Sequence, residues 1–443
     1  MSTMSHELII HNLGPVEDCC CRIDKFTVLT GPQSSGKSTI AKAIFFFRTI
    51  KNDFLTIMQQ GGPRIVTGSN DMRWNNTIQQ RLRNKFLELF GTSWIMPEDM
   101  RLEYRYSKHT YVIVYLKPSF DDRNFVSFDF SQDIEDYISD LDNRSFLNMT
   151  AGQSHTEEKN LAKLFDDKYE TVFIPAGRNL ITLLSTQLNY IFTSLEGSQL
   201  RSIDFITKRY TELILKLKPL FSNGIQGLLD EMRDQPELVK KSSTNKAAIN
   251  RLIPRAKEIL RGDYRYVEGE ERLYLDAKKY IKINFSSSGQ QEIVWVINLL
   301  FYYLHENKKV FLIMEEPESH LFPDSQQSIG ELLTLFANCG NQVLVTTHSP
   351  YILGTFNYLL LASQASTEFK ETVKTYVDKA YWLAAEEFAA YYIHDGGMSL
   401  AKDEEDNIIM VKNELIDGAS SEINGKGDAL LALLYQEDSD EHQ

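Results

Sequence analysis

Cysteine is scarce in this sequence, with four residues among 443. Three of them are consecutive, Cys19 to Cys21, and Cys339 stands alone. Adjacent cysteines lack the spacing by which a zinc site pairs its ligands, so the run is predicted to lie in a short apolar strand. A chain of this length also buries enough surface to fold without disulfides. The cysteine content therefore favours a reducing, cytoplasmic environment.

A secretory signal and a long hydrophobic run are also missing. The start, "MSTMSHELII", is followed by Glu17 and Asp18 rather than by a basic region and an apolar core. The most apolar stretch, Ile293 to Leu304, contains Asn298 and is shorter than the roughly 20 residues that cross a bilayer. We therefore expect no membrane span and no membrane partner.

Excess positive charge is absent as well, because the formal net charge is -14. Residues 402–443 hold twelve acids and three lysines and so contribute -9, which leaves -5 for the preceding 401 residues. The overall basic character typical of nucleic-acid binding is missing, but a mildly acidic body is compatible with a local basic surface. DNA is therefore a possible partner that the charge does not indicate.

Four short, continuous apolar runs predict buried parallel strands. They are "FTVLT" (Phe26 to Thr30), "VFI" (Val172 to Ile174), "VFLIM" (Val310 to Met314) and "VLVTT" (Val343 to Thr347). Helix-length patterns separate these runs, which is typical of an α/β fold. Between residues 64 and 145, the aromatic runs "YVIVYLK" and "FVSFDF" predict an attached antiparallel sheet.

The segment "GPQSSGKST", Gly31 to Thr39, fits the P-loop pattern and lies between a predicted strand and the helical run "TIAKAIFFF". Gly31 and Gly36 allow backbone N–H groups to turn toward phosphate at a helix N-terminus. We expect Lys37 to contact the β- and γ-phosphates of ATP and Ser38 to bind Mg²⁺. The other predicted ATP-binding residues of the loop are Ser34, Ser35 and Thr39. The alternative is a glycine-serine turn with an incidental lysine.

Two later strands end in groups suited to the chemistry of ATP. "VFLIMEEPESH" places Glu315 and Glu316 at the carboxyl end of a strand, where ligands of parallel sheets bind. Glu315 is predicted to hold Mg²⁺, and Glu316 to polarise the attacking water. "VLVTTHSP" places His348 at the same edge, where a neutral imidazole could contact the γ-phosphate.

The order of P-loop, "SSSGQ", acidic strand end and histidine resembles that of the ATP-binding-cassette ATPases. In that superfamily the serine-glycine-glutamine signature faces ATP held by another subunit, which implies a head-to-tail dimer with two sandwiched ATP molecules. By matching positions, Ser287 would be the hydroxyl donor, Ser288 would replace the first glycine, Gly289 would keep the second, and Gln290 would complete the motif. A compatible interpretation is a helix N-cap supported by Glu292.

Lys37 and Ser287 are 250 positions apart, which is more than in a compact transporter ATPase domain and indicates an insertion. Amphipathic segments between about residues 180 and 265 predict that this insertion is helical, with "QPELVKKSSTNKAA" as an exposed connector. The expected fold is thus a P-loop NTPase of ABC ATPase type, α/β, with a mixed sheet core, an antiparallel N-terminal sheet and an inserted helical block. The four expected units are a first ATPase lobe (1–180), the helical insertion (181–265), a second ATPase lobe (266–400) and an acidic, solvated C-terminal segment (401–443).

"EEPESHLFP" and "FIPAGRN" resemble stand-alone bacterial AAA-type ATP-binding proteins related to the overcoming-lysogenisation-defect nucleases. Glu315 stands where transporter ATPases usually have aspartate, and Phe322 replaces the aspartate of their dimer-contact loop. Arg178, in "PAGRN", would approach phosphate, couple the strand to a neighbouring subunit, or be structural.

The related nucleases continue into a metal-binding nuclease domain, whereas 95 residues follow His348 here, with acidic runs that look like solvated charge. This arrangement resembles the ATPase subunits of anti-phage systems such as PARIS, Septu and some retrons. The resemblance implies an ATP-hydrolysing sensor and scaffold that forms a homodimer or higher homo-oligomer and controls a separately encoded effector, a nuclease. The alternative is a DNA-repair ATPase that clamps DNA, and a transporter subunit is disfavoured by the insertion.

Overall fold

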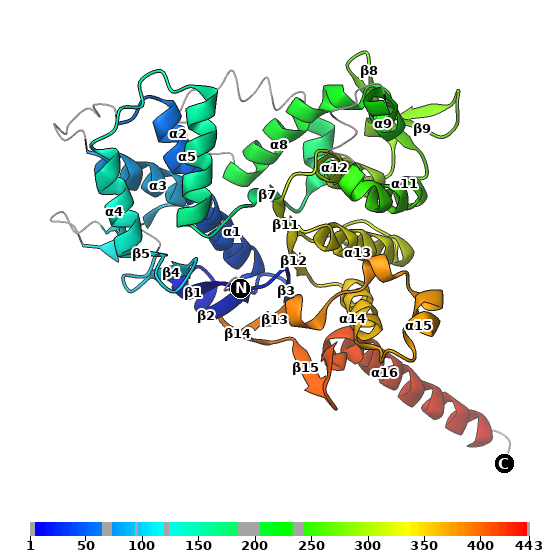
Figure 1. Ribbon diagram of the computed structural model, residues 1–443. Coiled ribbons are helices and arrows are strands. Elements are labelled where there is room, and N and C mark those ends of the chain that lie inside the picture. The colour runs from blue at the N-terminus through cyan, green and yellow to red at the C-terminus, as the bar shows by residue number, and fades with distance from the viewer. Residues whose placement is uncertain are drawn as a thin grey trace.

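The computed structural model describes residues 5–63, 73–93, 96–118, 124–184, 204–233 and 243–440. A central sheet divides the molecule, with helices on both of its faces and a second sheet to one side (Figure 1). Among the described residues, no helix is long and apolar enough to cross a membrane.

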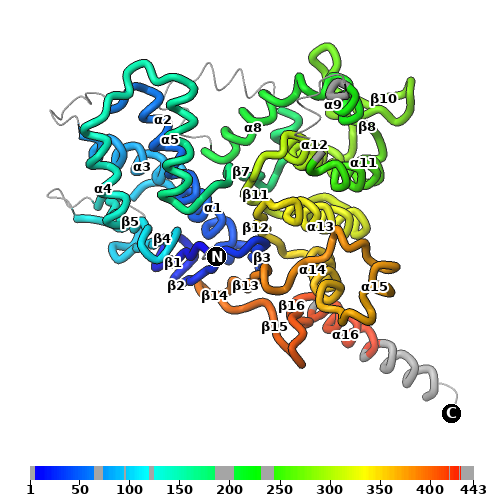
Figure 2. Tube along the Cα trace, viewed as in Figure 1, coloured from blue at the N-terminus to red at the C-terminus, as the bar shows by residue number. Residues whose placement is uncertain are grey.

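The central sheet has six strands in the described part of the chain, in the order β14-β13-β3-β12-β11-β7. Five of them are parallel, and β14 is an antiparallel edge strand. In Figure 2, the blue strand β3, from the N-terminal end of the chain, lies between β13 and β12, which come from its C-terminal part. The strands are β3 (Phe26–Thr30), β7 (Glu170–Ile174), β11 (Val310–Glu315), β12 (Gln342–Thr347), β13 (Phe388–His394) and β14 (Gly397–Leu400). The four strands predicted from apolar runs are confirmed, whereas β13 and β14 were not predicted.

Both faces of the central sheet are buried, which explains why its strands are continuous apolar runs. Side chains of each strand point alternately to the two faces. Those on one face, such as Phe26 and Leu312, belong to one core cluster, and those on the opposite face, such as Leu29 and Phe311, belong to a second cluster. The helices of the first cluster are α12 (Ser288–His305), α13 (Pro323–Asn338) and α14 (Pro350–Gln364). Helix α1 (Lys37–Arg48) packs in the second cluster.

The second sheet is antiparallel, as predicted, and has the order β2-β1-β4-β5-β6. Cys19 and Cys21 of β2 are buried and Cys20 is exposed, which confirms that the cysteine run is a strand. The strands are β1 (His6–Leu13), β2 (Val16–Ile23), β4 (Arg101–Arg105), β5 (Tyr111–Lys117) and β6 (Phe125–Phe130). The helices of this lobe are α2 (Ile50–Gln59), α3 (Trp74–Phe90), α4 (Gln132–Leu141) and α5 (Ala151–Leu164).

Helices occupy the described part of the predicted insertion. They are α8 (Phe205–Leu217), α9 (Gly224–Arg233) and α11 (Lys246–Leu260). A small sheet follows, formed by β8 (Asp263–Val267), β9 (Glu270–Tyr274) and β10 (Tyr280–Lys282). Most of the amphipathic run 180–195 and most of the predicted connector 235–248 lie outside the described residues. The division into four units remains a prediction.

The acidic C-terminal segment is more ordered than the predicted solvated tail. After α15 (Lys370–Tyr376), the strands β15 (Lys402–Glu405) and β16 (Ile408–Val411) form a hairpin that precedes α16 (Asn413–Asp440). Helix α16 leads away from the body of the molecule (Figure 1). Its first turns pack on α14, and most of its described side chains are exposed.

Candidate nucleotide-binding site

The parallel register brings the predicted site residues to one edge of the central sheet. Thr30 pairs with Thr347, and Thr346 pairs with Glu315, so the strands β3, β12 and β11 end side by side. Strand β7 ends level with Met314. The segments that follow these four strands therefore share one edge, which we call the carboxyl edge. Ligands of parallel sheets bind at such edges.

The P-loop connects β3 to α1 at the carboxyl edge. Gly31 and Gly36 have φ of 144° and 107°, in the range that other residues adopt only with strain. A Cβ at Gly31 would lie 2.2 Å from the carbonyl oxygen of Ile393, so β13 packs directly against the loop. Sequence reasoning missed this neighbour because β13 was not predicted.

The Lys37 side chain is buried and folds back onto its own loop. Its Nζ donates to the carbonyl oxygens of Gly31 at 2.8 Å and Pro32 at 2.6 Å. Burial lowers the pKa of this ammonium group, and the carboxylates of Glu316 and Glu318 oppose that effect. These contacts leave a cation at the N-terminus of α1, where phosphate binding is favoured.

The remaining loop residues differ in their exposure. Ser34 is exposed with φ of 61°, and Ser38 is exposed in the first turn of α1. Thr39 is half-buried. Ser35 has a buried Oγ without a hydrogen-bond partner. Exposed hydroxyls at the start of the helix can reach a ligand that binds above the loop.

Glu315 and Glu316 differ in burial and backbone geometry. Glu315 is buried; one carboxylate oxygen accepts from the Ala176 N–H at 3.2 Å, and Oε1 is buried without a hydrogen-bond partner. Glu316 has φ of 44° and a side chain that is 37% exposed, and its Oε2 accepts from the Ser319 hydroxyl at 3.2 Å. A non-glycine residue in this conformation carries strain on the order of 1 kcal/mol.

The orphan Oε1 of Glu315 fits a cation, because an uncompensated buried carboxylate oxygen is otherwise costly. Among the described residues, no three His, Cys, Asp or Glu side chains gather as a metal site. A Mg²⁺ ion here would take oxygen ligands from Ser38, Glu315 and the nucleotide phosphates, since Mg²⁺ is usually held by few protein groups.

His348 lies at the carboxyl edge together with a third acid, Glu318. His348 Nδ1 is 3.6 Å from Glu318 Oε1 and 3.9 Å from Glu316 Oε1, and the imidazole is 52% exposed. The same Glu318 oxygen accepts from the Thr347 hydroxyl at 2.8 Å and from the His348 N–H at 2.9 Å. Glu318 thus fixes the segment that carries His348. Sequence reasoning missed this role, although the third acid of "EEPES" was visible.

The predicted signature begins α12. Ser287 is the N-cap: its Oγ accepts from the Gln290 N–H at 3.3 Å, and Gln290 Oε1 accepts from the Ser287 N–H at 3.0 Å. The side-chain amide of Gln290 also donates to the carbonyl oxygen of Leu260 at 2.7 Å. The N-cap itself is therefore confirmed, but Gln290 supports it and the predicted supporting residue, Glu292, instead lies beside Arg178. The start of α12 keeps the partial positive charge of a helix N-terminus.

The substitution of serine for the first signature glycine costs no backbone strain. Ser288 is the first residue of α12 and is not among the residues with positive φ. Gly289 is constrained by space instead, because a Cβ there would lie 2.6 Å from the carbonyl oxygen of His320. The start of α12 is thus packed against the segment that follows Glu316. Phe322, the N-cap of α13, is 72% exposed in that same segment.

The structure brings the P-loop, Glu315, Glu316 and His348 together, but places the signature elsewhere. Helix α1 lies on one face of the central sheet and α12 on the other. Within the described chain, no hydrogen bond or ion pair joins residues 286–290 to residues 31–39.

Arg178 is fully buried behind the carboxyl edge. Its NH1 donates to the carbonyl oxygens of Pro175 at 3.0 Å and Glu315 at 2.6 Å, and its NH2 donates to that of Glu316 at 2.9 Å. Its Nε lies 3.1 Å from Glu292 Oε2 of α12. These contacts favour a structural role over contact with phosphate, because the guanidinium is already surrounded by protein oxygens.

Solved structures to which the chain is similar include heads of SMC proteins. One is an SMC head bound to the C-winged helix domain of ScpA, with 12% identity, 94% of this chain and 99% of that chain covered, and a TM-score of 0.40. The SMC head domain from Thermotoga maritima has 12% identity, coverage of 92% and 98%, and a TM-score of 0.36. An Smc head with an extended coiled coil, bound to the C-terminal domain of ScpA derived from Pyrococcus furiosus, has 13% identity, coverage of 95% and 99%, and a TM-score of 0.38.

No curated protein gives a significant match to the sequence. The sequence model of a family described as AAA ATPase domain matches residues 4–353, which include every residue of the candidate site. Since this match spans well over half of the chain, the protein belongs to the AAA ATPase domain family.

Proposed function

We propose that the protein binds ATP at the carboxyl edge and hydrolyses it. The observation that supports this most strongly is that Lys37, Glu316 and His348 meet at the ends of adjacent parallel strands. Lys37 would exchange its carbonyl partners for the β- and γ-phosphates, Glu316 would orient the attacking water, and His348 would contact the γ-phosphate. Mg²⁺ held by Ser38 and Glu315 would neutralise phosphate charge.

Two substitutions test this proposal. Lys37→Ala should weaken nucleotide binding, because it removes the cation of the loop. Glu316→Gln should keep binding within about threefold and lower kcat by about a hundredfold or more, because only the group that orients water is lost. Binding of a fluorescent ATP analogue and phosphate release measure the two effects. Glu404→Gln, at an exposed position in β15, is the matched control. Hydrolysis at the wild-type rate by Glu316→Gln would show that this carboxylate is not the base.

The signature supports a dimer in which each chain completes the site of its partner. Ser287–Gln290 present a helix N-terminus that does not contact the P-loop of its own chain. A helix N-terminus attracts phosphate oxygens through its free N–H groups. We therefore propose that ATP is sandwiched between the P-loop of one copy and the signature of a second copy.

We further propose that this ATPase is the sensor and scaffold of an anti-phage defence system and controls a separately encoded effector, a nuclease. The resemblance of "EEPESHLFP" and "FIPAGRN" to that group supports the assignment. Helix α16 is a candidate docking element, because Ile423 and Leu430 are 69% and 62% exposed and lie two turns apart on one face. The test is purification of the protein with the product of its neighbouring gene, with and without ATP. No ATP-dependent association would overturn the proposal.

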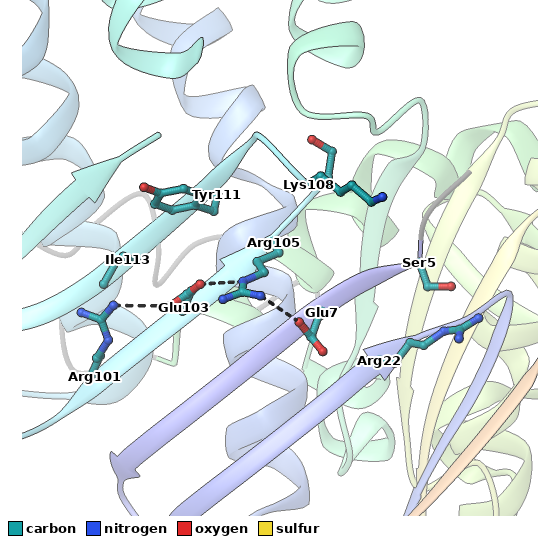
Figure 3. A pocket seen from close by; sticks show the side chains of 10 residues that line it. Ser5, Glu7, Arg22, Arg101, Glu103, Arg105, Lys108, Tyr111 and Ile113 are labelled. Atoms are coloured by element: carbon teal, nitrogen blue, oxygen red, sulfur yellow. Dashed lines mark hydrogen bonds and ion pairs between the residues drawn. The ribbon is translucent and has the colours of Figure 1, made fainter. Parts of the chain in front are cut away.

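A second candidate function, DNA binding, is favoured by one groove on the antiparallel sheet. The groove has a volume of about 780 Å³ and carries Arg22, Arg101, Arg105 and Lys108 against Glu7 and Glu103. Figure 3 shows Glu103 between Arg101 and Arg105, with Tyr111 beside them. Cations next to an aromatic ring are typical of nucleic-acid surfaces, although their own carboxylates neutralise part of this charge.

Binding of labelled DNA over a salt series tests the groove. If DNA lies there, Arg101→Ala and Lys108→Ala should each weaken binding and reduce the salt slope by about 1, since each phosphate contact releases about one counterion. Lys426→Ala, on exposed helix α16, is the matched control. Equal slopes in all variants would exclude this groove.

A further inference from the structure

A buried ion pair joins the segment after β7 to α12, the helix that begins with the signature. Arg178 follows β7, Glu292 belongs to the first turns of α12, and neither side chain has exposed surface. Because Glu292 lies one turn after Ser288, the pair contacts the helix directly behind the signature. The NH1 and NH2 groups of the same guanidinium donate to the carbonyl oxygens of Glu315 and Glu316.

Other contacts hold the first turn of α12 against the segments that follow β7 and β11. The Thr182 hydroxyl donates to the carbonyl oxygen of Gln291 at 2.9 Å. His320 Nδ1 lies 3.5 Å from Glu292 Oε1, and the His320 carbonyl closely approaches Gly289. A shift of the first turn of α12 would therefore displace Arg178, His320 or both, and each is connected to the backbone around Glu316.

The ion pair is incompletely satisfied. Several buried polar atoms of this cluster make no hydrogen bond of normal geometry. They are both carboxylate oxygens of Glu292, the Nε of Arg178, and the hydroxyl of Tyr210 on α8. Tyr210 is an electrostatic neighbour of both members, and its pKa is raised chiefly by burial. Buried polar groups are normally hydrogen-bonded, and a buried ion pair is weak support for stability. Stability alone therefore explains this cluster poorly, whereas a cluster with unused donors and acceptors can adopt a second arrangement.

We propose that Arg178 and Glu292 are positioning residues that couple the signature helix to the backbone of the catalytic Glu316. Glu316 is held at φ of 44°, and two hydrogen bonds from Arg178 fix the carbonyls on either side of its N–H and Cα. Movement of α12, when its signature engages a partner's nucleotide, passes through Glu292 to Arg178 and changes the orientation of Glu316. This inference rests on the proposed hydrolysis in a head-to-tail dimer.

Coupling of this kind makes the two nucleotides of a dimer interdependent. The signature of one chain faces the ATP of its partner, while Glu316 of that same chain acts on its own ATP. Hydrolysis at one site then depends on occupancy of the other, and the wild-type rate rises with ATP with a Hill coefficient approaching about 2, the number of sites.

Three variants separate coupling from folding. Arg178→Lys keeps the charge but loses the fork that contacts two carbonyls. Glu292→Gln keeps the shape but removes the charge that faces Arg178. Because breaking one side of a buried pair can unfold a protein, the double variant Arg178→Met with Glu292→Leu replaces the pair by apolar groups of similar size. Asp53→Asn is the matched control: it breaks the buried Asp53–Lys85 pair at 2.6 Å, which lies on α2 and α3.

The measurements are ATP-analogue binding, kcat, the Hill coefficient and the thermal midpoint. We expect each Arg178 or Glu292 variant that retains a cooperative thermal transition to bind nucleotide within about threefold of wild type, to lose about tenfold to a hundredfold in kcat, and to show a Hill coefficient near 1. Asp53→Asn should lower the thermal midpoint and leave the Hill coefficient unchanged.

Two results would overturn the coupling. One is a folded double variant with the kcat and Hill coefficient of wild type, and the other is a wild-type protein that hydrolyses ATP with a Hill coefficient of 1. A wild-type protein that binds but does not hydrolyse ATP would instead contradict the proposed function itself.

Discussion

Ser287 has two possible partners for its hydroxyl. In the structure its Oγ accepts from the Gln290 N–H and lies 3.1 Å from Gln290 Oε1. The cap thus fixes the hydroxyl at the N-terminus of α12, and a small rotation of the O–H could direct it toward a phosphate. In the proposed dimer, this side chain would serve the helix and the partner's phosphate in turn.

A bulky residue at this position should separate binding from assembly. We predict that Ser287→Trp binds ATP at its own P-loop as wild type does but forms no ATP-dependent dimer, because the ring blocks approach of the partner's phosphate. Loss of the cap should also cost about 1 kcal/mol of folding free energy. Size-exclusion chromatography coupled to light scattering, using the hydrolysis-deficient Glu316→Gln background, measures the dimer.

Thr150→Trp provides a matched control for that substitution. Thr150 and Gln153 form the same capping box at the start of α5. Its replacement should cost similar stability and leave the ATP-dependent dimer intact. Dimerisation of Ser287→Trp to the wild-type extent would contradict the signature assignment.

At the residue scale, the motifs predicted where the candidate site residues lie better than they predicted which groups support them. Glu316 and His348 directly follow strands that the apolar runs define, and Lys37 begins the helix after another such strand, so local sequence was sufficient to place them. Arg178 and Glu318 contact residues that are distant in the sequence, namely Glu292 and His348. Their burial follows from packing of separate elements, which no local pattern shows.

At the scale of elements, continuous apolar runs located four parallel strands to within two residues. Strand β13, "FAAYYIH", contains two alanines and a single β-branched residue, Ile393, so its strand propensity is weaker than that of the four predicted runs, and its place beside β3 depends on pairing with a segment from the opposite end of the chain. The acidic charge of residues 401–443 led to the prediction of a solvated segment. In the structure, the hydrophobic residues Leu415 and Ile416 pack against the core cluster and anchor α16.

Helix α16 yields a prediction at this scale. A chain that ends after Glu422 keeps Leu415 and Ile416 but loses the exposed Ile423 and Leu430. Because Ile423 and Leu430 are exposed and do not belong to the core cluster, we expect an unchanged thermal midpoint and unchanged ATP hydrolysis, with loss of association with the effector. Co-purification and phosphate release measure these properties.

Point variants exclude an effect of helix length. Ile423→Glu combined with Leu430→Glu should reproduce the truncation, while Leu147→Glu, at a position that is 77% exposed on the other lobe, should not. Full association of the truncated chain with the effector would show that α16 is not the docking element.

At the scale of the whole molecule, a buried polar cluster joins the two sheets at the end opposite the carboxyl edge. Arg48, the last residue of α1, contacts Asp167 at 3.0 Å, donates to Gln342 of β12 at 2.8 Å, and donates to His6 Nδ1 of β1 at 2.8 Å. His6 Nδ1 also lies 3.0 Å from the Tyr104 hydroxyl of β4. Because Nδ1 accepts from the Arg48 guanidinium, this nitrogen carries no proton and the imidazole is neutral.

This cluster should make the protein sensitive to acid. Burial, and then the Arg48 charge, lower the pKa of His6 from 6.5 to about 3. Between these values the unfolded chain binds a proton that the folded chain does not, so the free energy of unfolding decreases as the pH falls below about 6.5. At pH 5, the protonation of His6 in the unfolded chain is expected to lower the free energy of unfolding by about 2 kcal/mol.

Urea denaturation at pH 7 and pH 5 measures that loss. His6→Gln can still accept from Arg48 but does not titrate, so it should reduce the difference between the two pH values. His109→Gln, at an exposed position, controls for the change in composition. An equal acid loss in wild type and His6→Gln would contradict the role of this histidine.

The position of β3 between β12 and β13 determines when the nucleotide site can form during synthesis. Strand β3 ends at Thr30, whereas its two neighbours begin at Gln342 and Phe388. The P-loop therefore leaves the ribosome long before the strands that hold it, while β1 and β2 can pair at once. Pairing across such sequence distances is slow. The candidate nucleotide site consequently cannot be complete until translation has passed β13, and until then the apolar strand β3 lacks both of its neighbours, a state that favours aggregation.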